Sequence, residues 1–294
     1  MGWDALIDTM FIQCLINGLL LGGLYVLVTI GLSFAFGVMH LINTAQGEFV
    51  ILGAFLALFM YEYFGINPLL IWPLSFIIFF FIGYVLQRVA VERLVGAPVL
   101  MNLVFFLGLS ILIANLGLYI YGPWTRMVTT RISGASISIY GVTIPVIRLL
   151  VFCISMFSIL ALFIFLKKTR TGLAILATAQ DKNAAAMAGI DVRKMHAITL
   201  GIGTGTAAMA GTLISQIVSF TPMAGPMYTL FAFFVTVLGG MGYLPGALVG
   251  GLLLGLMESF IATYWSPKAV YFIMFFVLYI ILLIRPKGIF GRGL

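Results

Sequence analysis

Charged side chains are scarce in this sequence of 294 residues. Asp, Glu, Lys and Arg make up 8% of it, whereas a soluble domain carries about 25%. So few charges do not keep a globule of this size in solution, and 63% of the residues are hydrophobic. The apolar residues form long continuous runs, which favour membrane-spanning helices and exclude the alternating pattern of a β-barrel. We expect an all-α, polytopic helical membrane protein with a single transmembrane domain over residues 1–294.

Cysteine and histidine are also rare, with two of each. Cys14 and Cys153 fall inside apolar runs, so no disulfide framework is expected, and His40 and His196 are isolated from other metal-ligand residues. The chain has no GxxxxGKS/T phosphate loop and no cluster of acid, base and nucleophile. We therefore expect no enzymatic activity, no metal and no bound cofactor, with any energy source on another chain. A basic region at the amino terminus is also missing, so no cleaved signal peptide is expected.

The apolar runs predict eight or nine membrane-spanning segments, several of them glycine-rich and broken. The run 228–238 leaves the count open, because a helix needs about 20 residues to cross the hydrocarbon core. Gly18 and Gly22 are four residues apart, which permits close contact between helices. The predicted segments cover residues 10–36, 49–63, 69–86, 99–121, 144–166, 195–220, 228–238, 247–265 and 269–284.

The longest polar interruption, residues 167–194, holds six of the fifteen Lys and Arg residues. A basic loop between two spans is typical of the cytoplasmic side. Its alanine-rich middle, residues 178–188, predicts a short helix that stops at Gly189. Such a helix would be a docking element for a soluble partner protein. The alternative is an ordinary loop whose charges only set the topology.

Other segments also end in basic residues, at 88–93 and 285–292. These ends place the carboxyl end in the cytoplasm and the start of the first span outside. The main external segment is then 122–143, whose small polar and β-branched residues around Gly141 predict a β-hairpin. The net charge of +7 gathers at span ends, which indicates lipid headgroups and not nucleic acid.

Two acids lie beside or within apolar runs, where an ionisable group costs about 2.5 kcal/mol or more. Glu48 follows Asn43 and Gln46 in a polar run, and Glu258 lies within 247–265. We interpret Asn43, Gln46 and Glu48 as irregular backbone lining a substrate path or gate. The alternative for Glu48 is an interfacial acid. The alternatives for Glu258 are a buried structural hydrogen-bonder and an acid near the external headgroups.

The sequence GGMGYLPG at 239–246 is a further candidate for the path. Glycines and Pro245 break a helix and free backbone groups, and broken helices line the substrate site of many transporters. Gly239, Gly240 and Gly242 are the candidates on this run. The alternative is a tight cytoplasmic turn between two spans.

Four motifs, in order and over nearly the full length, resemble the inner-membrane permease subunits of the branched-chain amino acid ABC importers of bacteria. They are NGLLLGGLYVLVTIGLSFAFGVMHLIN followed by AQGEF, then RTGLAILATAQDKNAAAMAGIDVRKMHAIT, VLGGMGYLPGALVGGLLLGLMES and LIRPKGIFG. The resemblance implies a subunit that carries branched-chain or other hydrophobic amino acids across the inner membrane. It also implies that the 167–194 loop couples the chain to an ATPase through Gln180, Asp181, Asn183, Ala184, Ala185 and Gly189.

The partners that the resemblance implies are a second, related permease, two cytoplasmic ATP-binding subunits that hold ATP and Mg²⁺, and a periplasmic solute-binding protein. Three positions depart from the family pattern: Asn183 stands where Glu is usual, Thr44 where an aromatic residue is usual, and Gln46 where His is usual. Urea, short amides and aromatic or carboxylic acids are the alternative solutes. The rival class is a stand-alone secondary transporter or channel that uses Glu48 or Glu258.

Overall fold

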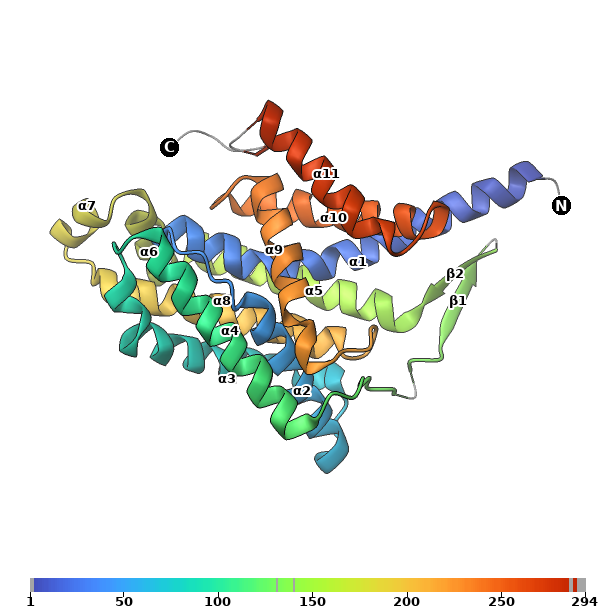
Figure 1. Cartoon of the computed structure of the whole chain (residues 1–294), viewed down its shortest axis with the longest axis horizontal. Helices are drawn as coiled ribbons and strands as arrows, with labels where there is room; N and C mark the ends of the chain where they lie inside the picture. The colour runs from blue at the N-terminus through green and yellow to red at the C-terminus, as the bar shows by residue number, and fades with distance from the viewer. Residues whose placement is uncertain (1–2, 131, 140, 286–287, 290–294) are drawn as a thin grey trace.

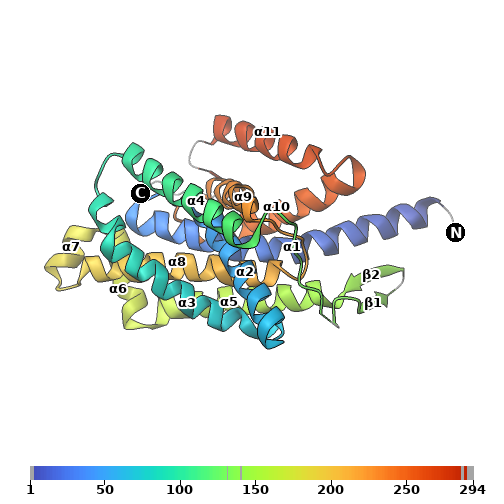
Figure 2. The same ribbon diagram turned by 60° about the horizontal axis from the view of Figure 1, so that its bottom comes forward.

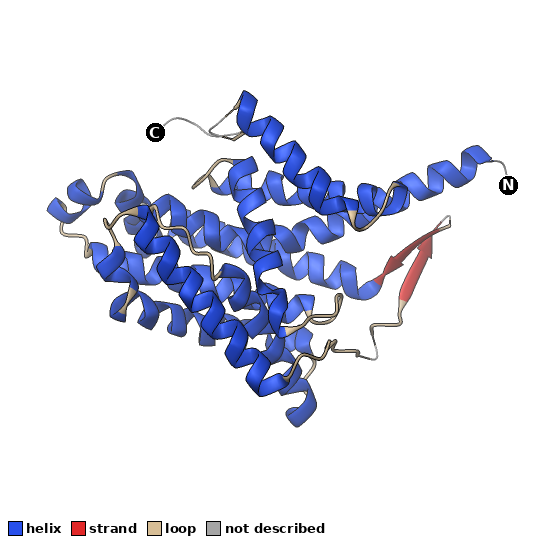
Figure 3. Ribbon diagram, viewed as in Figure 1, coloured by secondary structure: helices blue, strands red, loops and turns tan. Residues whose placement is uncertain are grey.

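The structure, a computed structural model, describes residues 3–130, 132–139, 141–285 and 288–289. This part of the chain folds into α-helices, two short 3-10 helices (η1 and η2) and one β-hairpin (Figure 3). In chain order the elements are α1 Trp3–Met39, α2 Gln46–Phe64, α3 Pro68–Val89, η1 Val91–Leu94, α4 Val99–Tyr121, β1 Ser136–Ile139, β2 Val142–Pro145, α5 Val146–Lys168, α6 Arg170–Gln180, α7 Lys182–Met187, α8 Val192–Ile214, η2 Pro222–Ala224, α9 Gly225–Gly239, α10 Leu244–Tyr264 and α11 Ala269–Ile284.

Eight helical segments in the described residues are long and apolar enough to cross a membrane. One of them joins η2 and α9 into Pro222–Gly239. α11 is apolar but has only 16 residues, about 24 Å at the helical rise, against a hydrocarbon core of about 30 Å. The prediction of an all-α, polytopic membrane protein is therefore confirmed, with eight segments of spanning length in the described residues and α11 as a shorter apolar helix.

The helices pack around a centre formed by α1 and α8, which run side by side in both views (Figures 1 and 2). Nearly all of α8 and most of α1 are buried, whereas most residues of α3, α4 and α5 are half-buried or exposed. Exposed apolar side chains on long helices suit lipid, which is as apolar as they are. The outer helices therefore separate the α1–α8 centre from the surroundings.

Glycines let the central helices touch through their backbones. A Cβ added to Gly18 would lie 2.8 Å from Leu256 Cα, and one added to Gly22 would lie 2.7 Å from Leu252 Cα. Real Cβ atoms do not come that close to a backbone, so α1 and α10 cannot keep this approach with larger residues. The predicted packing face at Gly18 and Gly22 is confirmed, and its partner is α10.

The hairpin lies at one end of the long axis, beside the amino-terminal end of α1, while α6 and α7 lie at the opposite end (Figures 1 and 2). β1 and β2 pair antiparallel, with Ile139 opposite Val142. The Gln13 side chain both donates to and accepts from the Thr143 backbone, at 2.8 Å each, and so ties the hairpin to α1. The hairpin predicted within 122–143 is confirmed and extends to Pro145. Residues 131 and 140 of this segment lie outside the described residues.

The sixth span ends earlier than the sequence predicts, at Ile214 instead of residue 220. Residues 215–220 leave the helix because Phe220 pairs with the segment after α4. The Arg126 N–H donates to the Phe220 carbonyl over 2.9 Å, and the Phe220 N–H donates to the Arg126 carbonyl over 2.8 Å. The two connections therefore join at the same end of the bundle as the hairpin.

Candidate functional site

The polar run after α1 is tied to the centre of the bundle by two amide side chains. Asn43 Nδ2 donates to Gln46 Oε1 over 3.2 Å. Gln46 Nε2 lies 3.2 Å from the Val28 carbonyl on α1 and 3.2 Å from the Gly203 carbonyl on α8. Asn43 and Gln46 are 2% and 1% exposed. The run therefore links α1, α2 and α8 through buried side-chain hydrogen bonds.

The irregular backbone is shorter than predicted. His40 to Asn43 is non-helical, but α2 begins at Gln46, so Gln46 and Glu48 belong to its first turn. The Asn43 carboxamide oxygen accepts from the Ala45 N–H over 3.0 Å, which turns the chain into the helix. The predicted irregular backbone is thus correct for Asn43 and wrong for Gln46 and Glu48.

Glu48 lies where α2, α4 and α9 meet. Its side chain is fully buried among these helices. The Ser110 hydroxyl on α4 donates to Glu48 Oε1 over 3.0 Å. Glu48 Oε2 has no hydrogen-bond partner within the described residues. A Cβ added to Gly225, the first residue of α9, would overlap the Glu48 carboxyl group.

Neighbouring backbone atoms reinforce this junction. The Gly47 N–H donates to the Thr229 hydroxyl oxygen over 2.9 Å, and that hydroxyl donates to the Thr44 carbonyl over 3.1 Å. Thr229 therefore bridges the start of α2 to α9. Helix starts leave backbone N–H groups without intrahelical partners, so a side-chain oxygen there satisfies one of them.

Glu258 belongs to a different set of contacts. The Tyr25 hydroxyl on α1 donates to Glu258 Oε2 on α10 over 2.5 Å. The Tyr25 ring meets Phe231 of α9 edge-on, with centroids 5.1 Å apart, and Phe231 stacks on Tyr271 of α11. Glu258 is half-buried and hydrogen-bonded, so it has the surroundings that the structural alternative describes.

The glycine run 239–246 is a tight turn between α9 and α10. Gly240 and Gly242 have φ of +91° and +80°, which glycine adopts without strain. A Cβ added to Gly242 would lie 2.8 Å from Gly37 Cα near the end of α1. Gly239 ends α9 and packs on Gly246 of α10. The geometry matches the turn alternative, because the break falls between two helices.

The basic loop forms an arm of two helices, α6 and α7, where the sequence predicts one helix over 178–188. The helix breaks at Asp181, whose Oδ1 accepts from the Asn183 N–H over 2.8 Å and the Ala184 N–H over 3.1 Å. An aspartate competes with the backbone for hydrogen bonds, so it caps a helix better than it continues one.

The arm ends as the sequence predicts. Gly189 has φ of +82°, and the Ile190 N–H donates to the Ala185 carbonyl over 3.0 Å. Ala185 is 4% exposed, while Met187 is 84% exposed. Of the six residues assigned to coupling, Ala185 alone is buried, and the others are exposed: Gln180, Asp181, Asn183, Ala184 and Gly189. The arm therefore presents an exposed face of polar and small or apolar residues, with Ala185 packed beneath it.

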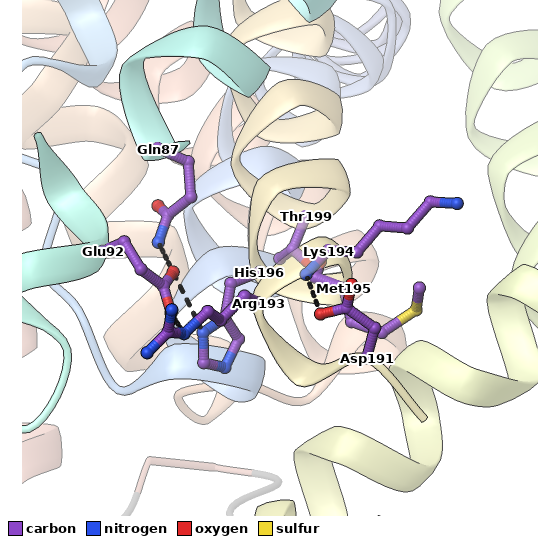
Figure 4. A network of polar contacts seen from close by, with 8 residues as sticks. All are labelled: Gln87, Glu92, Asp191, Arg193, Lys194, Met195, His196 and Thr199. Atoms are coloured by element: carbon purple, nitrogen blue, oxygen red, sulfur yellow. Dashed lines mark hydrogen bonds and ion pairs between the residues drawn. The ribbon is translucent and has the colours of Figure 1, made fainter. Parts of the chain in front are cut away.

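A polar network joins the end of α3 to the start of α8 (Figure 4). Gln87 Nε2 donates to Glu92 Oε2 over 3.0 Å, and His196 Nδ1 lies 3.5 Å from the same oxygen. Arg193 Nε lies 4.0 Å from Glu92 Oε1. From the sequence we expect His196 to be isolated from other metal-ligand residues. Its contact with Glu92 corrects that expectation. Nothing in the spacing of residues 92 and 196 indicates that they meet.

Sequence reasoning also missed Ser110, Thr229 and Tyr25. Each is a hydroxyl residue on an apolar helix, and this residue type commonly bonds across helices in membranes. That signal exists in the sequence, but it does not distinguish these three from other buried hydroxyls such as Thr29 and Ser33.

Comparison with known proteins gives consistent matches. The family model for the permease component of the branched-chain amino acid transport system matches residues 14–282. The high-affinity branched-chain amino acid transport system permease protein BraD of Pseudomonas aeruginosa is 32% identical over 295 residues, 96% of each chain. The corresponding permease proteins LivH of Salmonella typhimurium and Escherichia coli K12 are 31% and 30% identical over 297 residues, again 96% of each chain. No solved structure matches the chain.

The family match covers most of the chain, including α2, the α6–α7 arm and the turn between α9 and α10. The relatives have nearly the same length as this chain, so the likeness is not confined to one motif. The eight segments of spanning length and the matches over nearly the whole chain both indicate a membrane permease. This chain belongs to the family of permease components of branched-chain amino acid transport systems.

Proposed function

We propose that this chain is the membrane-spanning permease subunit of a bacterial ABC importer for branched-chain or other hydrophobic amino acids. It lies in the inner membrane, with the 167–194 loop, which contains the α6–α7 arm, and the carboxyl end in the cytoplasm. Part of that end, residues 286–287 and 290–294, lies outside the described residues. The chain does no chemistry and binds no cofactor, and two separate ATPase subunits hold ATP and Mg²⁺. The names of the relatives support the solute class.

The observation that carries this proposal is the exposed α6–α7 arm at one end of the bundle (Figure 1). α7 has six residues, and an isolated helix that short is marginal in water. Asp181 caps it and Gly189 ends it, so it is preformed at both ends. Docking into a groove on the ATPase completes its stabilisation and lets it transmit force.

The remaining partners follow from the two ends of the molecule. The hairpin end, with 122–143 and 221–227, receives the periplasmic solute-binding protein. A second, related permease completes the central path. Asn43, Gln46 and Glu48 act as polar gate elements, with Gly239, Gly240, Gly242 and Glu258 as further candidates. Asn43, Gln46 and Glu48 are buried within the chain, so in the proposed mechanism they would have to become accessible when the path opens.

Proline scanning of α7 tests the coupling role. Ala185→Pro removes the N–H that donates to the Asp181 carbonyl over 3.0 Å and breaks the helix. Lys182→Pro is the matched control, because Lys182 is the first helical position, where proline is tolerated. Asp181 before it is already extended, as a residue before proline prefers. Lys182→Ala controls for the lost charge.

The measurements are co-purification of the ATPase subunits and ATP-driven uptake in vesicles. We expect Ala185→Pro to lose both, and Lys182→Pro to match Lys182→Ala. Retention of ATPase binding and of uptake by Ala185→Pro would show that α7 is not the coupling element. Uptake assays with leucine, urea, short amides and aromatic acids then identify the solute class.

A further inference from the structure

A cavity of about 460 Å³ lies beneath the α6–α7 arm. Its walls come from the end of α1, the connection between η1 and α4, the α6–α7 junction and the start of α8. It is separate from the Glu48 junction, but three of the proposed coupling residues, Gln180, Asp181 and Asn183, also line it. The cavity is large enough for a small organic molecule.

Two buried polar side chains line this cavity without a hydrogen-bond partner in the described residues. They are Asn102 on α4, through Oδ1, and His196 on α8, through Nδ1; each residue is 3% exposed. A buried polar atom without a partner is costly, and native proteins pair the great majority of them. The unpaired Nδ1 of His196 is the atom that faces Glu92 Oε2, at 3.5 Å, so it is committed to that contact. Asn102 Oδ1 is therefore the buried atom that is free to bond a polar ligand.

Side chains of both charges line the cavity. Lys182 and Asp181 line it, and Lys182 forms no ion pair within the residues described. The Lys182 ammonium attracts a carboxylate, while the side-chain oxygen of Asn102 accepts from an ammonium. The Asp181 carboxylate, whose Oδ1 already caps α7, adds negative charge beside it. This combination suits a zwitterion better than a simple anion or cation.

Part of the cavity lining is apolar. Val38 and Leu41 from the end of α1 and Val99 from the start of α4 contribute to it. Apolar lining together with groups that bind a zwitterion matches a hydrophobic α-amino acid, whose side chain and backbone groups have these two characters. The expected ligand is therefore of the same class as the proposed solute.

The backbone at the rim is strained. His40, which lines the cavity, has φ of +55°, the one positive φ outside glycine in the described residues. Such a conformation is uncommon outside glycine, and here it ends α1, with the His40 N–H donating to the Phe36 carbonyl over 2.8 Å. His40 also begins the irregular segment that leads to Asn43 and Gln46. The cavity and the gate thus share one short stretch of chain.

We infer that this cavity is a site at which a hydrophobic amino acid on the cytoplasmic side binds and slows transport. The inference rests on the proposed function. The ligand would bridge Asn102 on α4 and Lys182 on α7, and so hold the arm in one position against the bundle. A ligand shifts such an equilibrium only through its different affinity for the two positions. Accumulated product would then limit its own import.

The test uses the complete transporter in vesicles, with the ATPase subunits inside and the binding protein outside. Initial uptake of labelled leucine is measured with and without unlabelled leucine preloaded in the lumen. We expect lumenal leucine to lower uptake several-fold in the unaltered protein. Asn102→Leu should remove this inhibition and leave uptake into empty vesicles unchanged. Asn102→Ala is the second variant, for use where the leucine variant does not accumulate.

The matched control is Asn115→Leu on the same helix, whose amide donates to its own helix at the Ile111 carbonyl over 2.7 Å. It should be inhibited like the unaltered protein. The inference is overturned if lumenal leucine has no effect, or if Asn102→Leu is inhibited as strongly as Asn115→Leu. It is also overturned if Asn102→Leu and Asn102→Ala lose uptake into empty vesicles, since the cavity would then belong to the path.

Direct binding separates this inference from the proposed function. Labelled leucine binding is measured on the purified complex without the binding protein. We expect Asn102→Leu to weaken binding by about tenfold or more, as for loss of a hydrogen bond to a charged group, and Asn115→Leu to have no effect. This result supports the site even if ATP-driven uptake fails. Equal binding by both variants contradicts the site even if uptake succeeds.

Discussion

The carboxyl group of Glu48 lies against the backbone of Gly225, the residue at which α9 begins. No side chain fits between them, because a Cβ on Gly225 would overlap the carboxyl carbon and both oxygens. Ser110 donates to the same carboxyl group from α4. Three helices that are distant in the sequence therefore meet on one buried acid. This junction and the α6–α7 arm are the two places where the proposed mechanism is open to test.

The first prediction concerns the space at Gly225. Gly225→Ala should destabilise the protein by about 1–3 kcal/mol, the usual cost of an overpacked site, and lower uptake. The control is Gly108→Ala on α4, where an added Cβ meets nothing within 4 Å. Thermal unfolding in detergent compares the two. An unfolding midpoint for Gly225→Ala equal to that of Gly108→Ala would mean that the α2–α9 approach is looser than described.

The second prediction concerns the charge of Glu48. Glu48→Gln keeps an oxygen that can accept from Ser110 and keeps the shape of the side chain, but it cannot ionise. We expect uptake to fall several-fold while thermal stability stays close to that of the unaltered protein. Glu48→Ala, which removes the acceptor as well, should lose both. Normal uptake by Glu48→Gln would assign Glu48 a purely structural role.

The third prediction concerns the bond between α1 and α10. Tyr25→Phe removes the hydroxyl that donates to Glu258, so stability should fall by about 1–3 kcal/mol. In the double variant with Glu258→Ala, which removes the acceptor, the two losses should not add, because both changes remove the same interaction. Tyr119→Phe, at a side chain that is 89% exposed, is the control and should have no effect. Strictly additive losses would argue against the bond.

The fourth prediction concerns the end of the arm. Gly189 has φ of +82°, and an added Cβ meets nothing within 4 Å. Gly189→Ala therefore introduces only conformational strain, roughly 1–2 kcal/mol. We expect weaker binding of the ATPase subunits with the helical bundle intact. Gly134→Ala has equally open space and no positive φ, so it should bind them normally. If both variants bind the ATPase subunits equally well, Gly189 has no role in coupling.

Much of the fold follows from local sequence signals. Long apolar runs must satisfy their backbone groups internally, so they form helices in a membrane. The predicted span 99–121 coincides with α4, which follows Pro98 and ends at Gly122. The hairpin around Gly141 was also predictable from local sequence, because residues with strong conformational preferences set its turn.

The features that escaped prediction depend on side chains competing with, or meeting across, distant parts of the chain. Asp181 breaks the arm because its carboxylate caps α7, and composition alone favours a continuous helix there. Glu48 was identifiable as an acid in an apolar setting, but its partner Ser110 is 62 residues away. The contact between Glu92 and His196 likewise exists only once α3 and α8 have packed together.

The most direct test of the central claim compares two energy sources in vesicles of defined composition. The account predicts amino acid uptake when the chain is reconstituted with its ATPase subunits, a partner permease, the binding protein and ATP. It predicts no uptake by the purified chain alone under a proton gradient. Gradient-driven uptake by the chain alone, with no further stimulation by the ATPase subunits and ATP, would contradict the account and make the protein an autonomous carrier.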